Sequence, residues 1–342
     1  MTIHIGILGG GNISQTHARA ASEIEGVKIV AVGGHNLEKA QALAAIYGAK
    51  AYGEIEAFLQ HKPMDLILIG SPSGVHAEQG IAAARHGLHA LIEKPIDITT
   101  EQADALIAAC EKAGVKLGVF YQERVAPDSL KLKALLNEGR LGKIILVSAQ
   151  VKWYRPPDYY GASRWRGVWA LAGGGALMNQ GVHTVDLLLW LLGDVTRVWG
   201  KAKTMLHDIE VEDTATAVLE FERGTLGTLE CATSVYPGYA RRIEITGSEG
   251  TIILENDRLI AADLRVPIAG LISPPEQNSE RSTSPVISDV SGHRAIIEDF
   301  LRAIATGSAP MCDGREARRS VELVQAIYQS SDTGQEINLC HR

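Results

Sequence analysis

Cysteine is scarce in this sequence of 342 residues, which contains only four: Cys110, Cys231, Cys312 and Cys340. They are scattered, and no two of them form a Cys-x-x-Cys pair. This spacing argues against a zinc site and against a disulfide framework, and it suits a reducing compartment. We therefore expect no metal ion and a location in the cytoplasm.

An excess of positive charge and a long apolar run are also missing. The formal net charge is −7 at pH 7, and the arginine pairs at 241–242 and 318–319 are isolated, so we expect no nucleic-acid partner. No segment is apolar over enough residues to span a bilayer, and the N-terminus lacks a signal-peptide pattern, so we expect no membrane partner. With 46% hydrophobic and 21% charged residues, the composition is that of a soluble globular protein with room for two domains.

The first part of the chain, residues 1–122, alternates short β-branched runs with alanine-rich segments. We expect strands at 3–8, 27–32, 65–69, 88–92 and 116–120, and helices at 13–24, 37–47, 75–86 and 100–113. Strands without polar alternation, each followed by a helix, predict a parallel sheet covered on both faces. Because such connections are right-handed, the sheet should be doubly wound.

The remaining residues, 123–342, show a different pattern after a helix at 128–138. Polar and apolar residues alternate in the expected strands at 144–154, 195–206, 214–221, 225–234 and 242–246. This period predicts an antiparallel sheet with one covered face. A mostly apolar helix at 176–192 should be buried, and residues 265–290, rich in Pro and Ser, suggest a mobile lid. The closing helices at 293–305 and 316–330 are expected in this second domain, unless they pack back on the first.

A glycine-rich turn, Gly9-Gly10-Gly11-Asn12-Ile13-Ser14, lies between the first strand and the first helix. The first glycine permits a tight turn, and the second lets a pyrophosphate approach the backbone at the helix N-terminus. Ser14 stands where the third glycine of this motif usually lies. An ordinary glycine turn is the alternative, but the position within a β-α-β unit favours a dinucleotide site.

The end of the second strand, Val32-Gly33-Gly34-His35-Asn36, carries no carboxylate. An acidic residue at this position usually binds the ribose hydroxyls of NAD. Its absence, together with His35 and Lys39, permits NADP, although no arginine is present to bind a 2′-phosphate. The cofactor is therefore expected to be NAD or NADP, and the choice stays open.

Glu93-Lys94-Pro95 follows the expected strand at 88–92, and Gly70-Ser71-Pro72-Ser73-Gly74-Val75-His76 follows the one at 65–69. In open α/β sheets the carboxyl ends of the strands border the ligand crevice. A lysine there is suited to binding a substrate hydroxyl, although a surface lysine is the plain alternative. The second turn is expected over the nicotinamide, and His76 either faces the cofactor or only caps the next helix.

A second cluster follows Gly173-Gly174-Gly175. On one helix, Asn179, His183 and Asp186 are spaced by four and three residues and should share a face. The glycines would let a ligand approach the helix start, His183 would accept a hydroxyl proton, and Asp186 would orient its ring. A buried, fully hydrogen-bonded histidine is the alternative for His183.

Taken together, these motifs resemble the Gfo/Idh/MocA oxidoreductases, the family of glucose–fructose oxidoreductase and inositol dehydrogenase, over essentially the whole chain. The resemblance implies an N-terminal Rossmann domain and a C-terminal open, mainly antiparallel mixed sheet whose outer face builds a homodimer or homotetramer. It makes Lys94 and His183 the catalytic residues. The expected cofactor-binding residues are Gly9, Gly11, Asn12, Ile13, Gly34, His35, Ser71, Pro72, His76, Glu93, Lys94 and Gln122. The expected substrate-binding residues are Lys94, Arg124, Tyr154, Arg155, Asn179, His183 and Asp186.

One position departs from the family pattern. Many inositol-dehydrogenase-like members carry Asp where this chain has Asn179, and an amide cannot relay a proton, so His183, with or without Lys94, must transfer it. Asn at this position is reminiscent of members that oxidise C3 of nucleotide sugars or glycosides. Nearby aromatic residues and arginines, such as Tyr154 and Arg155, suit a ring with several hydroxyls, or form a structural cluster.

The sequence therefore predicts an NAD(P)-dependent dehydrogenase or reductase that acts on a secondary hydroxyl of a sugar, glycoside, nucleotide sugar or polyol. Two alternatives stay open. The first is a redox-neutral glycosidase or lyase that keeps its NAD and oxidises C3 only transiently. The second is a non-catalytic regulator that binds dinucleotide. The fold alone does not choose among the three.

Overall fold

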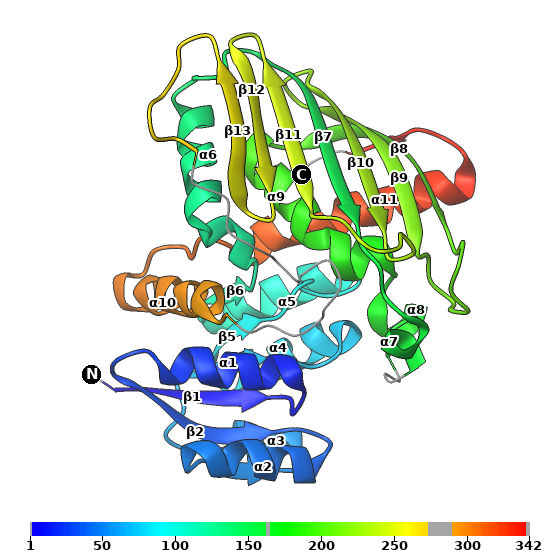
Figure 1. Cartoon of the computed structure of the whole chain (residues 1–342). Coiled ribbons are helices and arrows are strands. Elements are labelled where there is room, and N and C mark those ends of the chain that lie inside the picture. The colour runs from blue at the N-terminus through cyan, green and yellow to red at the C-terminus, as the bar shows by residue number, and fades with distance from the viewer. Residues whose placement is uncertain (1, 162–164, 273–288, 340–342) are drawn as a thin grey trace. The chain divides into compact units, whose positions relative to one another are not determined.

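The computed structural model describes residues 2–161, 165–272 and 289–339. The chain divides into two compact units (Figure 1). Unit 1 comprises Met1–Gln122 and Val286–Arg318, and unit 2 comprises Glu123–Pro285 and Arg319–Arg342. Most of the expected lid, residues 273–288, lies outside the described residues. Across the ranges just given, no helix combines the length and apolar character that crossing a membrane requires.

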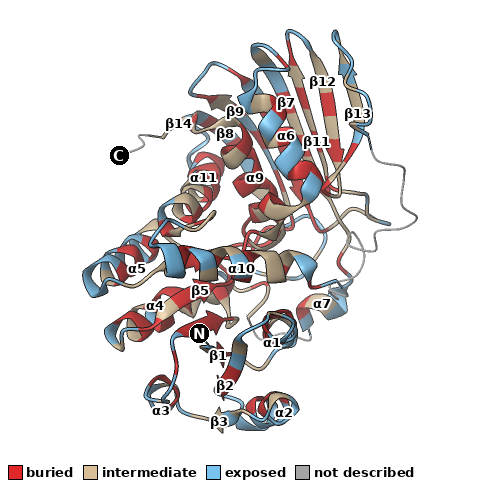
Figure 2. Ribbon diagram, turned by 90° about the vertical axis from the view of Figure 1, so that its left-hand side faces the viewer, coloured by how far each residue is buried: buried red, intermediate tan, exposed pale blue. Residues whose placement is uncertain are grey.

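A parallel sheet forms the centre of unit 1. Within its described part, the strands are β1 (Ile3–Leu8), β2 (Val27–Gly33), β3 (Lys50–Tyr52), β4 (Leu66–Ile69), β5 (His89–Ile92) and β6 (Leu117–Val119). Their order in the sheet is β3-β2-β1-β4-β5-β6, and the central strands are coloured mostly as buried in Figure 2. The strand order reverses between β1 and β4, which is where doubly wound sheets bind their ligands.

The helices of unit 1 cover this sheet. They are α1 (Asn12–Ser22), α2 (Leu37–Tyr47), α3 (Ile55–Leu59), the short η1 (Ser73–Val75), α4 (His76–Arg85), α5 (Thr100–Ala113) and α10 (Ser291–Thr306). Helix α1 packs on α10, and α4 packs on α5. Local signals set several ends. The Asn36 side chain accepts a hydrogen bond from the Lys39 amide at the start of α2, and Gly48 ends this helix in the left-handed conformation (φ 65°).

A mixed sheet forms unit 2, in the order β13-β12-β11-β7-β10-β9-β8-β14. The strands are β7 (Ile144–Lys152), β8 (Val195–Lys203), β9 (Thr214–Phe221), β10 (Leu226–Ala232), β11 (Arg242–Gly247), β12 (Gly250–Glu255), β13 (Arg258–Leu264) and β14 (Ile337–Asn338). Strands β7 and β10 pair in parallel, and the other neighbours pair antiparallel. Buried positions alternate with more exposed ones along most of these strands (Figure 2), so one face is covered.

Several helical segments accompany the unit 2 sheet. They are η2 (Gln122–Val125), which begins at the last residue of unit 1, α6 (Pro127–Asn137), α7 (Pro157–Gly161), α8 (Trp169–Ala172), η3 (Ala176–Gly181), α9 (Val182–Leu192) and α11 (Gly314–Thr333), whose first residues belong to unit 1. Helix α6 packs on β13, and η3 packs on β9 and β10. The prediction of a single α-helix at 176–192 was wrong in one respect. Residues Ala176–Gly181 form a π-helix, which leads into α9.

Candidate active site

The glycine-rich turn after β1 is built for a close approach of backbone and ligand. Gly9 has a φ of +124°, and a Cβ at this residue would lie 2.4 Å from Ser14 Oγ and 2.9 Å from the Gly70 carbonyl oxygen. Gly11 precedes α1 without any side-chain hydrogen bond to the helix start, and a Cβ there would meet nothing within 4 Å. The first amide groups of α1, at Asn12 and Ile13, thus begin a helix whose positive end is open, which fits a pyrophosphate.

The end of β2 offers space rather than a carboxylate. A Cβ at Gly34 would make only ordinary contacts, the nearest with Gly9 C at 3.6 Å. His35 and Lys39 are exposed beside it, and the Asn36 side-chain oxygen Oδ1 already accepts from the Lys39 amide. This arrangement fits the adenosine ribose of either NAD or NADP.

The turns after β4 and β5 carry the expected nicotinamide-side residues. The Ser71 hydroxyl donates to Gln79 Oε1 at 2.6 Å, and Pro72 precedes η1. His76 was expected either to face the cofactor or to cap the next helix. Its ring is instead buried between two turns, with Nδ1 2.8 Å from the Pro95 carbonyl oxygen and Nε2 2.9 Å from the Ser71 carbonyl oxygen.

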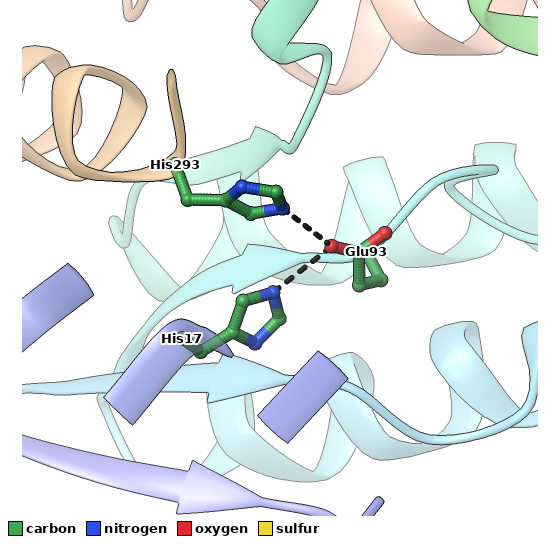
Figure 3. A group of neighbouring side chains, drawn as sticks. All are labelled: His17, Glu93 and His293. Atoms are coloured by element: carbon green, nitrogen blue, oxygen red, sulfur yellow. Dashed lines mark hydrogen bonds and ion pairs between the residues drawn. The ribbon is translucent and has the colours of Figure 1, made fainter. Parts of the chain in front are cut away.

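Glu93, the residue before Lys94, is buried between two histidines that sequence reasoning missed (Figure 3). Its Oε1 lies 2.9 Å from His17 Nε2, on α1, and 3.7 Å from His293 Nε2, on α10. Burial alone would raise the pKa of Glu93, but the hydrogen bond with His17 and the nearby His293 ring outweigh it and hold the pKa well below its usual range. Burial lowers the pKa of His17. The expected cofactor residue Glu93 is therefore a buried carboxylate with internal partners.

In unit 2, His183 lies in the first turn of α9 with its Nδ1 2.7 Å from Glu123 Oε2. Glu123 Oε1 also lies 3.6 Å from Arg241 Nη1. The carboxylate of Glu123, 60 positions earlier in the chain, thus lies beside His183, whereas helical spacing pointed only to Asp186 as a carboxylate partner. Sequence offered no signal for this pairing except the position of Glu123 just after a strand.

Asp186 instead binds an expected substrate residue. Arg124 Nε donates to Asp186 Oδ2 and Arg124 Nη2 donates to Asp186 Oδ1, both at 2.7 Å. Both side chains are buried. This bidentate pair links η2, which carries Arg124, to α9, which carries Asp186, and gives both residues a structural role.

The glycine run before η3 serves internal packing, and the expected approach of a ligand there stays a prediction. A Cβ at Gly175 would lie 1.8 Å from the Glu212 carbonyl oxygen, and one at Gly174 would lie 2.0 Å from the Tyr328 hydroxyl. The Glu212 carboxylate accepts from the amides of Gly175 and Leu177 at 2.8 and 2.7 Å, and from the Tyr328 hydroxyl at 2.9 Å. Glu212 thereby anchors the segment that carries Asn179 and leads to His183.

A cavity of about 600 Å³ lies in unit 2 beside α7, a volume within the range of small-molecule sites. Its lining includes the expected residue Tyr154 together with Tyr160, Arg166 and His207. Arg155 is buried under it, with its guanidinium carbon 5.0 Å from the Trp153 ring centroid and Nη1 donating to the Tyr154 carbonyl. Arg155 thus fits the structural cluster that we considered as the alternative to substrate binding, whereas Tyr154 lines the cavity.

The structure brings the expected residues together within each unit. In unit 1, the turns after β1, β4 and β5 meet at the carboxyl ends of the strands, since the Gly70 and Glu93 amides bond to the ends of neighbouring strands. Lys94 is half-buried there, and the Gln122 side chain packs near Gly292. In unit 2, Asn179 and His183 follow one another in η3 and α9, both half-buried.

Known proteins resemble the chain along its whole length. A family model described as an oxidoreductase family with an NAD-binding Rossmann fold matches residues 3–121, and the model of the GFO/IDH/MocA C-terminal domain matches residues 129–253. The rhizopine catabolism protein MocA of Rhizobium meliloti is 30% identical over 72% of this chain and 76% of its own length. D-xylose 1-dehydrogenase (NADP(+)) 2 of Haloferax volcanii is 29% identical over 98% of this chain and 99% of its own length. The crystal structure of the WlbA dehydrogenase from Bordetella pertussis in complex with NADH and UDP-GlcNAcA superimposes with a TM-score of 0.90 and 32% identity, covering 100% of this chain and 98% of that one.

Proposed function

The chain belongs to the Gfo/Idh/MocA family of NAD-binding oxidoreductases, and from this premise we propose that it transfers hydride between NAD(P) and a secondary hydroxyl of a sugar or sugar derivative. The observation that carries the proposal is the turn of Gly9–Gly11. It leads into a helix without a side-chain cap, at the point where the strand order reverses. When bound there, a nicotinamide cofactor supplies the hydride acceptor or donor.

His183 is the proposed base of the reaction. The Glu123 carboxylate at Nδ1 orients the ring and favours the tautomer whose Nε2 lone pair can accept the hydroxyl proton. Lys94 is the proposed donor to the substrate oxygen, because an ammonium group stabilises the negative charge that develops as the hydroxyl loses its proton. Asn179, an amide, is proposed to bind a substrate hydroxyl without relaying a proton.

For the substrate we propose a hexose derivative that carries an anionic group, with nucleotide-linked uronic acids as the first class to test. The cavity lined by Tyr154, Tyr160 and Arg166 supplies aromatic faces for a ring and a guanidinium for a carboxylate or phosphate. The WlbA dehydrogenase, which resembles this chain at 32% identity, was crystallised with such a compound. The relatives named above as dehydrogenases favour net oxidation over the redox-neutral and regulatory alternatives.

We further propose that the protein forms a homodimer or homotetramer through the uncovered face of the unit 2 sheet. Large apolar side chains there are about half exposed: Ile145, Leu146, Trp199, Val218 and Leu226. Trp199 and Val218 are cross-strand partners, as are Leu146 and Leu226, and such exposed apolar pairs are of the kind that marks protein interfaces. The buried free thiols of Cys110, Cys231 and Cys312 support the proposed cytoplasmic location.

The proposal is tested by absorbance at 340 nm with NAD or NADP and a panel of neutral sugars, polyols, uronic acids and nucleotide sugars. Growth of the reduced-nicotinamide band with one class, faster with one cofactor, identifies both. Substrate cleavage without that band would point to the redox-neutral alternative. Binding of dinucleotide without any conversion across the panel would favour the regulator.

A further inference from the structure

The backbone on both sides of Lys94 is tied down by buried side chains. We propose that the Glu93 carboxylate and the His76 ring are positioning residues that clamp the Lys94 segment from either side. The inference rests on the proposed role of Lys94 in catalysis. All the residues concerned lie in unit 1.

The first clamp is the Glu93 carboxylate. Its Oε2 accepts a hydrogen bond from the Lys94 amide at 3.1 Å, while its Oε1 faces His17 and His293 (Figure 3). His17 is fully buried and stacks on Phe120, with ring centroids 4.3 Å apart. Since α1 carries His17 and α10 carries His293, one carboxylate ties two helices to the backbone of Lys94.

The second clamp is the His76 ring, which is 1% exposed. Nδ1 faces the carbonyl oxygen of Pro95, the residue after Lys94, and Nε2 faces the carbonyl oxygen of Ser71. The ring therefore lies between the backbone that follows Lys94 and the backbone of the turn after β4. The buried carboxylate of Asp97 lies on the same turn and accepts from the Ala77 amide at 2.8 Å. This hydrogen bond ties the same turn to the start of α4.

The two clamps fix the backbone position of Lys94, from which its flexible side chain reaches the substrate. A catalytic group works best when its own position is fixed by packing and by hydrogen bonds from residues behind it. Two histidines and a carboxylate also form a set that metal ions use. However, the 2.9 Å between His17 Nε2 and Glu93 Oε1 is a direct hydrogen-bond distance, which favours a clamp without metal.

The test compares Glu93→Gln, His76→Gln and His76→Ala with His86→Gln as the matched control. His86 ends the same helix that His76 begins, and its ring also has two partners, the Ala82 carbonyl and Glu56. For each protein we would measure kcat and KM, the Kd of NAD(P)H by fluorescence, and the rate at which an N-hydroxysuccinimide acetate acylates Lys94, followed by peptide mass spectrometry. Acylation of the exposed Lys112 serves as the internal reference.

We expect Glu93→Gln and His76→Ala to lower kcat about 10- to 100-fold with KM and cofactor Kd within a few-fold. The acylation rate of Lys94 should change while that of Lys112 does not, and His76→Gln should recover part of both effects because its amide nitrogen donates to the carbonyls. His86→Gln should match the wild type. The Gln variants preserve side-chain volume, so they keep the test informative if His76→Ala does not fold.

Several results would overturn the clamps. Wild-type kcat in both Glu93→Gln and His76→Ala would do so, as would a lower kcat with unchanged acylation of Lys94. Stoichiometric metal in the purified wild type, lost in Glu93→Gln, would replace the clamp by a metal site. If Lys94→Ala itself turned over at the wild-type rate, the proposed role of Lys94 would fail. The acylation rates would still decide whether the clamps exist.

Discussion

Single residues take their roles here from partners that lie far along the chain. His183 lies beside Glu123, and Glu93 lies beside His17, which is 76 positions away. The sequence motifs located Lys94 and His183 themselves, because strand ends and a glycine-preceded helix leave local patterns. The carboxylates and histidines that hold them leave none, since a contact between distant residues has no period to detect.

Replacing His183 by alanine should lower kcat by about 10²- to 10⁴-fold, the usual contribution of a general base. The alkaline rise in rate should flatten as well, because no group then titrates into the active form. Steady-state rates between pH 6 and 10 at saturating substrate measure both effects. A variant with the wild-type pH profile would remove His183 from the mechanism.

Replacing Glu123 by glutamine should lower kcat about 10- to 100-fold without abolishing turnover, because the amide keeps the volume but loses the charge that orients the His183 ring. The cofactor Kd should stay within a few-fold, since Glu123 belongs to unit 2 and the glycine-rich turn to unit 1. Measuring kcat and the cofactor Kd on the same preparations separates an effect on turnover from an effect on cofactor binding. Unchanged kcat would assign the pairing with His183 to structure alone.

Helices and strands with strong end signals matched their predicted bounds, while short or irregular ones did not. Helices Leu37–Tyr47 and Thr100–Ala113 and strand Thr214–Phe221 were predicted to the residue, because each helix has a side-chain cap at its start and a left-handed glycine after its end, and the strand alternates regularly. Strands β3 and β14 and helix α3 were missed because two to five residues carry too little pattern. Strands β12 and β13 were also missed. The π-helix depends on the tertiary contacts of Glu212 and was not predictable from helical periodicity.

Gly175→Ala should strongly destabilise unit 2, because the added Cβ would lie 1.8 Å from the Glu212 carbonyl oxygen. Backbone must shift to relieve such a contact, and we expect a loss of more than about 2 kcal/mol in the free energy of unfolding. Gly161→Ala is the control, because a Cβ there meets nothing within 4 Å. Urea denaturation followed by tryptophan fluorescence compares the two. Equal midpoints would show that the glycine run is not required for packing.

Glu212 should make the stability of unit 2 depend on pH. Burial raises the pKa of Glu212 from its ordinary value of 4.5 to about 7, against the hydrogen bonds that it accepts. The folded state therefore holds the proton between these two values while the unfolded state has lost it. The free energy of unfolding should fall as pH rises through this window, by at most about 3 kcal/mol. Denaturation of wild type and Glu212→Gln at pH 4.5, 6 and 8 isolates this contribution, and parallel pH curves for the two proteins would contradict it.

For the whole molecule, fold class and family followed from the sequence because the motifs extend over both parts of the chain. The division into a parallel sheet and a mixed sheet agrees with the expectation from strand patterning. What the sequence left open, the sugar and the choice of NAD or NADP, depends on side chains such as Arg166, His207 and His35, whose surroundings are set by folding. Their chemistry is compatible with more than one ligand.

Trp199→Glu on the uncovered face of the unit 2 sheet should weaken the proposed association of subunits. A carboxylate would be buried beside the partner's apolar surface without a compensating charge, which commonly costs several kcal/mol. Sedimentation equilibrium should show a dimer or tetramer for the wild type and a shift towards monomer for the variant. A wild-type protein that sediments as a monomer at all concentrations would contradict the interface.

The most direct test of the central claim is the fate of the hydrogen on the carbon that reacts. A substrate that reduces NAD(P) would be labelled with deuterium at the carbon bearing the oxidised hydroxyl, and the reduced cofactor would be weighed by mass spectrometry. Direct hydride transfer predicts reduced nicotinamide one mass unit heavier, formed in equal amount to the oxidised sugar. Deuterium released to water, or returned to the product without net reduced cofactor, would contradict the proposed dehydrogenase.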